Sequence, residues 1–147
     1  MKLLTASLLT FAWPLAAQAE IIVTDPWARA SVLASRPSAA YLTLTSDAPD
    51  RLLEVTSPVA GHVMLHGVAT DSAGVTRMVH IEELDVSPGT PVTLAPGDSH
   101  LMLMDLSRKL EEGESFPMTL VFEGTGDVTV DVPVLGPGAM GPTEERP

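Results

Sequence analysis

The sequence predicts an all-β domain, built as an antiparallel β-sandwich. Short segments that are rich in β-branched residues, or that alternate between apolar and polar residues, recur between Gly, Pro and Asp turn signals. No stretch keeps a helical period of apolar residues for three turns. About eight or nine such short strands in one small domain are typical of a sandwich, in which each strand buries one face.

The expected strands are short apolar or alternating runs bounded by turn residues. They cover residues 21–24, 40–45, 52–56, 62–68, 75–81, 92–94, 100–106, 116–122 and 128–134. In the last of these, every second residue is a valine, and the four valines share one face, as in a half-buried strand. Pro133 cannot donate a backbone hydrogen bond, so this strand is expected at the edge of a sheet.

Turn residues separate these strands. Residues 71–74 are expected to form the loop between two strands, while Pro88-Gly89 and Pro96-Gly97 are expected to be turns on either side of the strand at 92–94. Residues 107–113 are the one segment expected to form a short helical turn, closing at Gly113. Trp27 and Tyr41 are expected in the core, because aromatic residues make up only 4% of the chain.

The first 19 residues have the features of a cleavable signal peptide. Lys2 precedes a short, interrupted apolar run, and Ala17-Gln18-Ala19 fits an Ala-x-Ala cleavage site. The run is too short for a membrane span, and a retained N-terminal anchor is the alternative. We therefore expect an exported, periplasmic protein, monomeric and without a membrane span in its mature form. It would consist of one domain over residues 20–136 and a disordered Gly- and Pro-rich tail over residues 137–147.

The chain is strongly acidic, with a formal net charge of -11. Removal of residues 1–19 takes away only Lys2 and leaves 7 basic against 19 acidic residues, a net charge of -12. Nucleic acids and anionic membrane surfaces would be repelled, whereas a basic surface on a partner protein would be attracted.

The chain contains no cysteine. A blue-copper centre needs a thiolate beside its two histidines, and a purple dinuclear copper centre needs bridging thiolates, so neither can form here. Thiol redox catalysis and disulfide exchange are excluded for the same reason.

Histidine and methionine are concentrated between residues 62 and 104. This stretch holds all four histidines and four of the seven methionines: His62, Met64, His66, Met78, His80, His100, Met102 and Met104. The two-residue period of a strand places nitrogen and sulfur side chains together on one face of three separate strands. Two His and two Met form a ligand set that suits Cu(I) better than zinc, calcium or magnesium.

Two other interpretations of these residues remain open. Zinc could be bound by His62 and His66 with His80 or His100, in an exported zinc-binding protein or hydrolase. Alternatively, the methionines fill gaps in the core of a plain interaction domain that binds no metal. A serine hydrolase is not expected, because the adjacent residues Asp98-Ser99-His100 cannot adopt the geometry of a catalytic triad.

The spacing of these residues matches a family motif. Eleven residues separate His66 from Met78, twenty-one separate Met78 from His100, and the motif ends as His100-Leu-Met102. This pattern resembles that of the periplasmic copper chaperones of the PCuAC type, in which a Met can follow the first His; here that position is Gly67. The segments 25–29, 39–44 and 94–104 also resemble the family, so that the similarity covers about the whole exported domain.

The resemblance implies a cupredoxin-like sandwich that binds one Cu(I) through His66, Met78, His100 and Met102. It further implies a carrier rather than an enzyme, supplying the dinuclear CuA centre of cytochrome c oxidase. The acceptor would be subunit II of the oxidase or a thiol-bearing copper assembly factor. The tail lacks histidine, so a second, Cu(II)-type site is not expected there, and Met140 is not expected to bind copper.

Strand geometry distinguishes between the two methionines that follow His100. A strand rises about 3.3 Å per residue, so Met102 begins about 6.6 Å and Met104 about 13 Å from His100. No Gly or Pro between residues 101 and 106 allows the strand to curl sharply. Met102 is therefore the expected ligand, and Met104, like Met64, is expected in the core or in support of the ligands.

Overall fold

The computed structural model describes residues 18–142, and within this range it contains strands and connecting loops but no helix. Its ten strands are β1 (Ile21–Arg29), β2 (Ser38–Ser46), β3 (Asp50–Thr56), β4 (Ala60–Thr70), β5 (Thr76–Ile81), β6 (Leu84–Val86), β7 (Val92–Leu94), β8 (His100–Leu106), β9 (Ser115–Phe122) and β10 (Gly126–Leu135). All nine predicted strands are present, and several are longer than predicted. The additional strand, β6, has only three residues, too few to show a period in the sequence.

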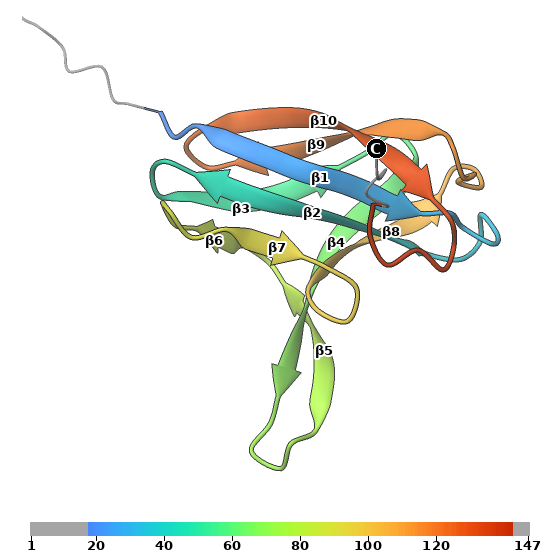
Figure 1. Cartoon of the computed structure of the whole chain (residues 1–147), viewed down its shortest axis with the longest axis horizontal. Helices are drawn as coiled ribbons and strands as arrows, with labels where there is room; N and C mark the ends of the chain where they lie inside the picture. The colour runs from blue at the N-terminus through green and yellow to red at the C-terminus, as the bar shows by residue number, and fades with distance from the viewer. Residues whose placement is uncertain (1–17, 143–147) are drawn as a thin grey trace, which may run out of the picture.

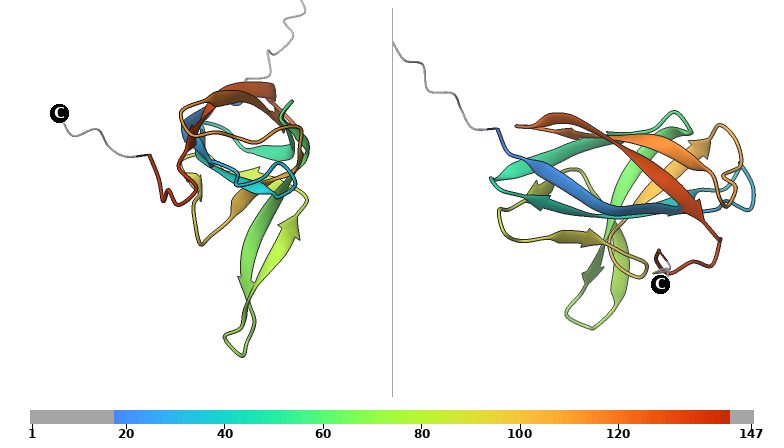
Figure 2. Two further views of the ribbon diagram at one scale, coloured as in Figure 1. Left: turned by 90° about the vertical axis from the view of Figure 1, so that its right-hand side faces the viewer. Right: turned by 45° about the horizontal axis from the view of Figure 1, so that its top comes forward.

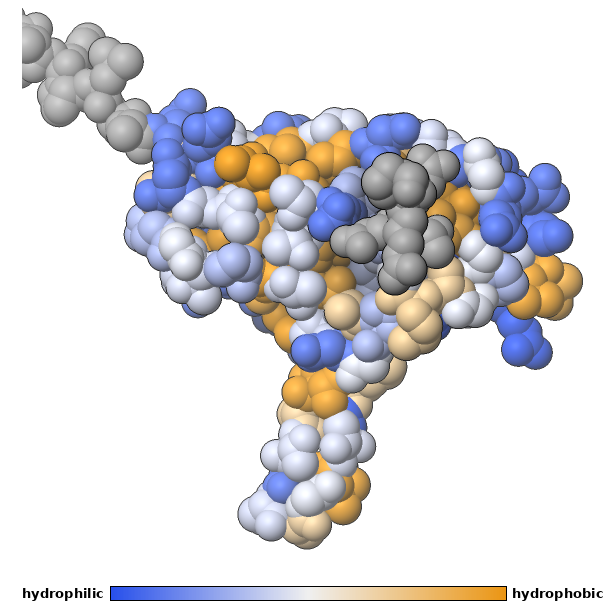
Figure 3. All heavy atoms as spheres, in the orientation of Figure 1, coloured by the Kyte–Doolittle hydropathy of each residue, from blue (hydrophilic) through white to orange (hydrophobic). Residues whose placement is uncertain are grey.

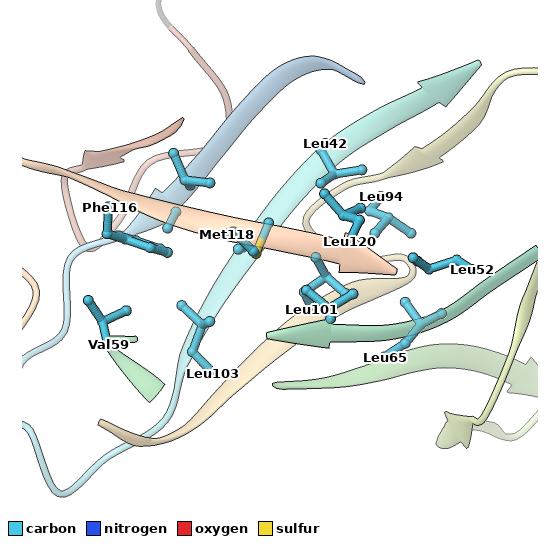
Figure 4. Packing of buried hydrophobic residues seen from close by; sticks show 14 of the residues in the cluster. Leu42, Leu52, Val59, Leu65, Leu94, Leu101, Leu103, Phe116, Met118 and Leu120 are labelled. Carbon is cyan, nitrogen blue, oxygen red and sulfur yellow. The ribbon is translucent and has the colours of Figure 1, made fainter. Parts of the chain in front are cut away.

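The strands form one continuous sheet in the order β5-β4-β8-β2-β1-β10-β9-β3-β6, with β7 also paired to β2. Only β1 and β10 run parallel; the other pairs are antiparallel. The sheet curls around its own core (Figure 2), and β9 crosses β2 and β8 on the opposite side of that core (Figure 4). The predicted all-β sandwich is confirmed, and the one parallel pair makes its sheet mixed rather than purely antiparallel.

Aliphatic side chains from both layers fill the interior (Figure 4). Leu101 and Leu103 of β8 meet Phe116, Met118 and Leu120 of β9, and all five are almost fully buried. Each such side chain contributes about 1.5–3 kcal/mol when it is removed from water. The core can therefore stabilise the fold without help from a metal.

The hairpin of β4 and β5 projects from the body of the domain (Figures 1 and 2). Its turn is the predicted loop at residues 71–74. There the Asp71 carboxylate accepts hydrogen bonds from the backbone nitrogens of Ala73 and Val75, both at 2.9 Å, and Gly74 has a φ of +80°. Hydrophobic surface lies exposed along this hairpin (Figure 3), and Val68, Val75, Met78 and Val79 contribute to it. β5 pairs only with β4, so its outer edge is unpaired within the described part of the chain.

The prediction that β10 is an edge strand is wrong. β10 lies between β9 and β1, although β1 pairs with it only from Val134 onward. The Val134 nitrogen donates a hydrogen bond to the Glu114 carbonyl at 2.8 Å on the β9 side. Successive backbone nitrogens of a strand point to opposite sides, so the Pro133 nitrogen, which has no hydrogen to donate, points toward β1. At this residue β1 has not yet begun to pair with β10. An interior strand thus accommodates the proline without losing a hydrogen bond.

The helical turn predicted at residues 107–113 is also absent, and this segment forms an extended loop that ends in a turn. Its backbone bonds to the distant residues Ser31, Val59 and Val134, while Glu111 forms a local turn with Glu114. The Leu110 nitrogen donates to the Ser31 hydroxyl at 2.8 Å, and the Gly113 nitrogen donates to the Val134 carbonyl at 2.9 Å. Leu110 is fully buried, so its side chain holds the loop against the core. Gly113 does mark the end of the segment, with a φ of +91°.

The ends of the domain are described only in part. Residues 1–17 of the predicted signal peptide and residues 143–147 of the predicted tail lie outside the described residues. Residues 137–142 form no strand, and the Arg29 side chain holds them near the body, with its Nε donating to the Ala139 carbonyl at 2.9 Å. Among residues 18–142, no helix is long and apolar enough to cross a membrane.

Candidate metal centre

Three histidines lie in one row across neighbouring strands. In the register of the sheet, His66 of β4 is directly opposite His80 of β5 on one side and His100 of β8 on the other. The ring centroid of His66 is 6.1 Å from that of His80 and 5.6 Å from that of His100, and both pairs meet edge to face. The row lies on the face opposite the buried residues Leu65 and Leu101, and therefore on the outside of the sheet.

The predicted methionine ligands flank this row on its two sides. Met78 is opposite Val68, and Met102 is opposite Met64. Each pair lies one step from His66, where one step is two residues along a strand; Met78 is displaced toward the tip of the hairpin and Met102 toward the body. Each of these methionines is thus a diagonal neighbour of His66, at the distance of about 7–8 Å that long side chains can span. We call the outer surface of β5, β4 and β8 the ligand face; it carries all eight of His62, Met64, His66, Met78, His80, His100, Met102 and Met104.

His66 is the common neighbour of the other three predicted ligands. His100 lies directly opposite it, and Met78 and Met102 lie on its two diagonals. The register also places His80 and Met64 next to His66, so strand pairing alone does not exclude them from the site. It does separate Met104 from His66 by two steps, next to His62.

The His66 ring has a buried nitrogen without a hydrogen-bond partner. Its Nδ1 is enclosed by protein and makes no hydrogen bond in the described structure. Burial lowers the pKa of His66 below its ordinary value, and the neighbouring His100 and His80 lower it further. The imidazole is therefore neutral at neutral pH, which is the form that binds metals. An unpaired nitrogen in such a position fits a metal ligand better than a packing residue.

His100 is oriented by the loop before β8. Its Nδ1 lies 3.0 Å from the Asp98 main-chain carbonyl oxygen. A carbonyl can only accept, so Nδ1 carries the proton and the lone pair remains on Nε2. The Asp98 carboxylate instead accepts from the Ser99 nitrogen, so the residues 98–100 do not form a hydrolase triad.

The predicted ligands differ widely in exposure. His100 is 6% exposed, His66 and Met102 are half-buried, and Met78 on the hairpin is 63% exposed. Met64 and Met104, which were expected in the core or in support of the ligands, are not in the core and lie half-buried on the ligand face. The methionine that fills the core is Met118, whose strand carries no histidine and which the spacing of potential ligands could not identify.

His62 is separate from the histidine row. It lies two steps from His66 along β4, and its Nδ1 is 3.2 Å from the Asp105 carboxylate. Within the described residues, no group of three His, Cys, Asp or Glu side chains is placed to hold a metal ion. The zinc site considered from His62, His66 and a third histidine is therefore not supported by the geometry.

Gly67 lies behind the histidine row, on the opposite face of β4. It is buried, and a Cβ at this position would lie 2.5 Å from Cδ1 of Ile81. Ile81 is the residue of β5 that follows His80, and its side chain packs over the glycine. A methionine at this position of the motif would thus point away from the ligand face, and the glycine leaves room for the Ile81 side chain.

The structure contains a cavity beside the site that the sequence did not predict. The cavity has a volume of about 430 Å³ and is lined by His100, Met78, Tyr41 and two arginines, Arg29 and Arg77, among others. Trp27 and Tyr41 are buried, as predicted, but they stack on one another with ring centroids 4.4 Å apart, next to this cavity and outside the main core cluster. Alternation along β1 and β2 could have placed Arg29 and Tyr41 on one face, but not next to β8.

Comparisons with known proteins agree with this arrangement. Residues 21–134 match the family model described as "Putative lipoprotein LpqE-like". The uncharacterized protein RP573 of Rickettsia prowazekii is 30% identical over 126 residues, which cover 82% of this chain and 69% of that protein.

Solved structures of two relatives have the same fold. The copper-bound PCuAC domain from PmoF2 is 33% identical, with a TM-score of 0.67 over 83% of this chain and 97% of that domain. The CuI-DR1885 protein of Deinococcus radiodurans is 33% identical, with a TM-score of 0.60 over 77% of this chain and 78% of that one. Together with the family model, these matches show that the chain belongs to the LpqE-like family and that its β-sandwich is a domain of the PCuAC type.

Proposed function

We propose that this domain is a periplasmic copper chaperone that binds one Cu(I) through His66, Met78, His100 and Met102. The observation that carries the proposal is the position of His66. It is the cross-strand neighbour of the other three ligands, and its buried Nδ1 lacks any other partner among the described residues. Two imidazoles and two thioethers form a neutral, largely soft ligand set, which favours Cu(I) over zinc or Cu(II).

The relatives support the choice of metal. The PmoF2 domain was solved with copper bound, and the DR1885 protein was solved with CuI. Both share about a third of their residues with this chain over most of its length. We infer that this chain also binds copper, because its ligand face presents the imidazole and thioether groups that Cu(I) prefers.

The domain is a carrier and not an enzyme. Four protein ligands around one metal leave no open position for a substrate, whereas a catalytic metal site keeps one open. Copper therefore leaves by ligand exchange: an incoming thiolate forms a bond to copper as a thioether bond breaks, without a change in oxidation state. Met78 is the most exposed of the four ligands and is the natural first one to be replaced.

The cargo is destined for the CuA centre of cytochrome c oxidase. It passes either directly to subunit II or first to a thiol-bearing assembly factor. The functional unit is the domain at residues 20–136, a monomer exported by the signal peptide at residues 1–19. A copper carrier outside the cytoplasm agrees with the lipoprotein description of the family.

A metal titration tests the proposal. Purified protein with residues 1–19 removed is titrated with Cu(I) in the presence of a competing chelator, and in parallel with Zn(II). We expect one tightly bound Cu(I), little affinity for zinc, and the same β-sheet circular dichroism spectrum with and without copper, since the core supplies the folding energy. Stoichiometric zinc binding with exclusion of copper would refute the proposal. An apo form that is unfolded would show that the core alone does not supply the folding energy.

Delivery is tested by mixing. The copper-loaded protein is combined with a reduced, cysteine-bearing copper acceptor, and the metal content of both is measured after separation. We expect copper to move to the acceptor, because thiolates bind Cu(I) more strongly than thioethers do. Retention of copper by the domain would count against a role in delivery while leaving the binding site intact.

A further inference from the structure

The cavity beside the ligand face is lined by positive charge, which is unusual in so acidic a protein. The chain has 8 Lys and Arg against 19 Asp and Glu, yet two arginines, Arg29 and Arg77, line this one space. The acidic residue that lines it is Asp98. His100 and Met78 open into the same cavity, so a molecule inside it would touch two of the proposed copper ligands and both arginines.

Arg29 is held in place by several contacts, none of them with an anion. Its guanidinium carbon lies 5.6 Å from the centroid of the Tyr41 ring, in a cation–π contact. Its Nε donates to the Ala139 carbonyl at 2.9 Å, and its Nη2 lies 3.4 Å from the Met140 sulfur. None of these partners is an anion, and no carboxylate forms an ion pair with Arg29 among residues 18–142. A guanidinium fixed in this way needs little further ordering when it binds a carboxylate.

Arg77 makes a smaller contribution. Its Nη2 is 3.5 Å from the Asp71 carboxylate, and most of its side chain is exposed to solvent. An exposed ion pair of this kind is weak and can exchange its partner. The cavity therefore has one preorganised arginine and one adaptable arginine at its rim.

We propose that this cavity binds the carboxylate of a thiol-containing copper-exchange ligand, with Arg29 as the principal anchor. This inference rests on the proposed copper site and extends it to the chemistry of the exchange partner. The carboxylate binds Arg29 while the thiolate reaches the copper next to Met78. The thiol releases its proton to solvent, the new Cu–S bond forms, the Cu–S bond to Met78 breaks, and copper remains Cu(I) throughout. The source of this thiol–carboxylate pair is a small thiol acid or a cysteine beside an acidic residue of a protein.

The negative charge of the domain helps to test the proposal. With 7 basic and 19 acidic residues after residues 1–19 are removed, its net charge of -12 repels anions at long range, so anionic thiols should be at a disadvantage without a local site. A preference for anionic thiols must therefore come from positive charge at the cavity and not from the net charge of the domain.

The test measures how fast three small thiols remove Cu(I) from the loaded protein. The thiols are 3-mercaptopropionate, 2-mercaptoethanol and cysteamine, which are anionic, neutral and cationic. Each rate is expressed as the ratio of wild type to variant, so that the intrinsic reactivity of each thiol cancels. We expect Arg29→Gln to slow removal by 3-mercaptopropionate about tenfold and removal by the other two thiols less than twofold. Arg77→Gln should have a smaller effect in the same direction.

Arg36→Gln is the matched control, because it removes the same charge from an exposed residue that does not line the cavity. It should leave all three rates unchanged. A second measurement needs no variant: propionate, which lacks a thiol, should inhibit removal by 3-mercaptopropionate but not by 2-mercaptoethanol. The same rates measured with a short peptide that carries Cys next to Asp determine whether a protein can supply the pair.

Two results would overturn the inference. One is an equal loss of rate for all three thiols in Arg29→Gln, which would make Arg29 a structural residue. The other is a lack of inhibition by propionate in the wild type. Failure of the proposed function would be recognised earlier and separately, because the wild-type protein would then not retain Cu(I) against the chelator.

Discussion

The two strands that flank β4 bring proposed copper ligands to the same face, but the two strands differ in burial and order. β8 lies inside the sheet between β4 and β2, and its His100 is 6% exposed and fixed by a hydrogen bond to the Asp98 carbonyl. β5 is an edge strand on a projecting hairpin, and its Met78 is 63% exposed. One side of the proposed site is thus part of the rigid body, and the other side is open to solvent.

This difference suits the proposed function, in which one site must both hold and release copper. The ligands on β8 are ordered before the metal arrives, so little conformational entropy is lost when they bind it. The ligand on β5 must be ordered on binding, and an incoming partner can reach it. Affinity should therefore depend mainly on β8, whereas the rate of exchange should depend mainly on β5.

The largest expected effect comes from the buried side of the site. His100→Ala should weaken Cu(I) binding at least about a hundredfold, about 2.8 kcal/mol, because it removes a buried, preordered imidazole directly opposite His66. His62→Ala is the matched control: it removes an imidazole from the same face, two steps from His66, and should leave affinity within about twofold. Chelator competition measures both. Equal losses for the two variants would mean that the histidine row is not the site.

Substitution of the two proposed methionine ligands should affect copper in different ways: one mainly its affinity, the other also its rate of release. Met102→Ala should weaken Cu(I) binding at least about tenfold, about 1.4 kcal/mol. Met78→Ala should weaken it less, because ordering the exposed side chain offsets part of the energy gained from the bond to copper. It should also speed release to a thiol, since the entry position is then already vacant. A larger loss of affinity for Met78→Ala than for Met102→Ala would reverse the comparison between the two strands.

Met104 should matter little for copper. It is opposite His62 and two steps from His66, so Met104→Ala should change Cu(I) affinity by less than about twofold. Because Met104 is half-buried on the outer face, its loss should lower the free energy of unfolding by about 1 kcal/mol rather than by the amount typical of a core cavity. Urea denaturation of the apo protein and chelator competition separate the two effects. A tenfold loss of copper affinity would make Met104 a ligand.

The smallest effect on copper is expected from Asp50, which stabilises the body of the domain. Burial alone would raise the pKa of Asp50, but hydrogen bonds from Thr125, Gly124 and Arg51 outweigh burial and lower it. The stabilisation is therefore present above the ordinary pKa and lost as the pH falls through the lower folded value.

Asp50→Asn should lower the melting temperature by roughly 4 °C at pH 7. The difference from wild type should shrink as the solution is acidified below the ordinary pKa of 3.8. Copper affinity at pH 7 should stay the same. A difference in melting temperature that persists unchanged at pH 2 would show that ionisation of Asp50 is not the cause.

Much of this structure could be predicted from the sequence, because strand period and turn residues are local signals. The strands and the loop at residues 71–74 follow from these signals, as does the sharing of a face by His62, Met64 and His66. The order of the strands is not a local property. That β4 lies between β5 and β8, with His66 opposite both His80 and His100, became visible only in the folded sheet.

The incorrect predictions also concern features that depend on contacts between segments distant in the sequence. Pro133 was expected at an edge, but its position lacking an N–H falls where β1 has not yet paired. Residues 107–113 have helix-forming residues, but Ser31 and Val134 bind their backbone instead. The cavity at Arg29 combines residues from β1, β2, β5 and β8, which no period along one strand could have connected.

The most direct test of the central claim is an NMR titration of the methionine methyl groups with Cu(I), with each signal assigned from single Met→Leu variants. Coordination changes the chemical shift of the methyl group bonded to the ligating sulfur. We expect large shifts for Met78 and Met102 at one equivalent of copper, small shifts for the neighbouring Met64 and Met104, and none for the core residue Met118. Large shifts at Met64 or Met104, with Met78 and Met102 unchanged, would contradict the central claim.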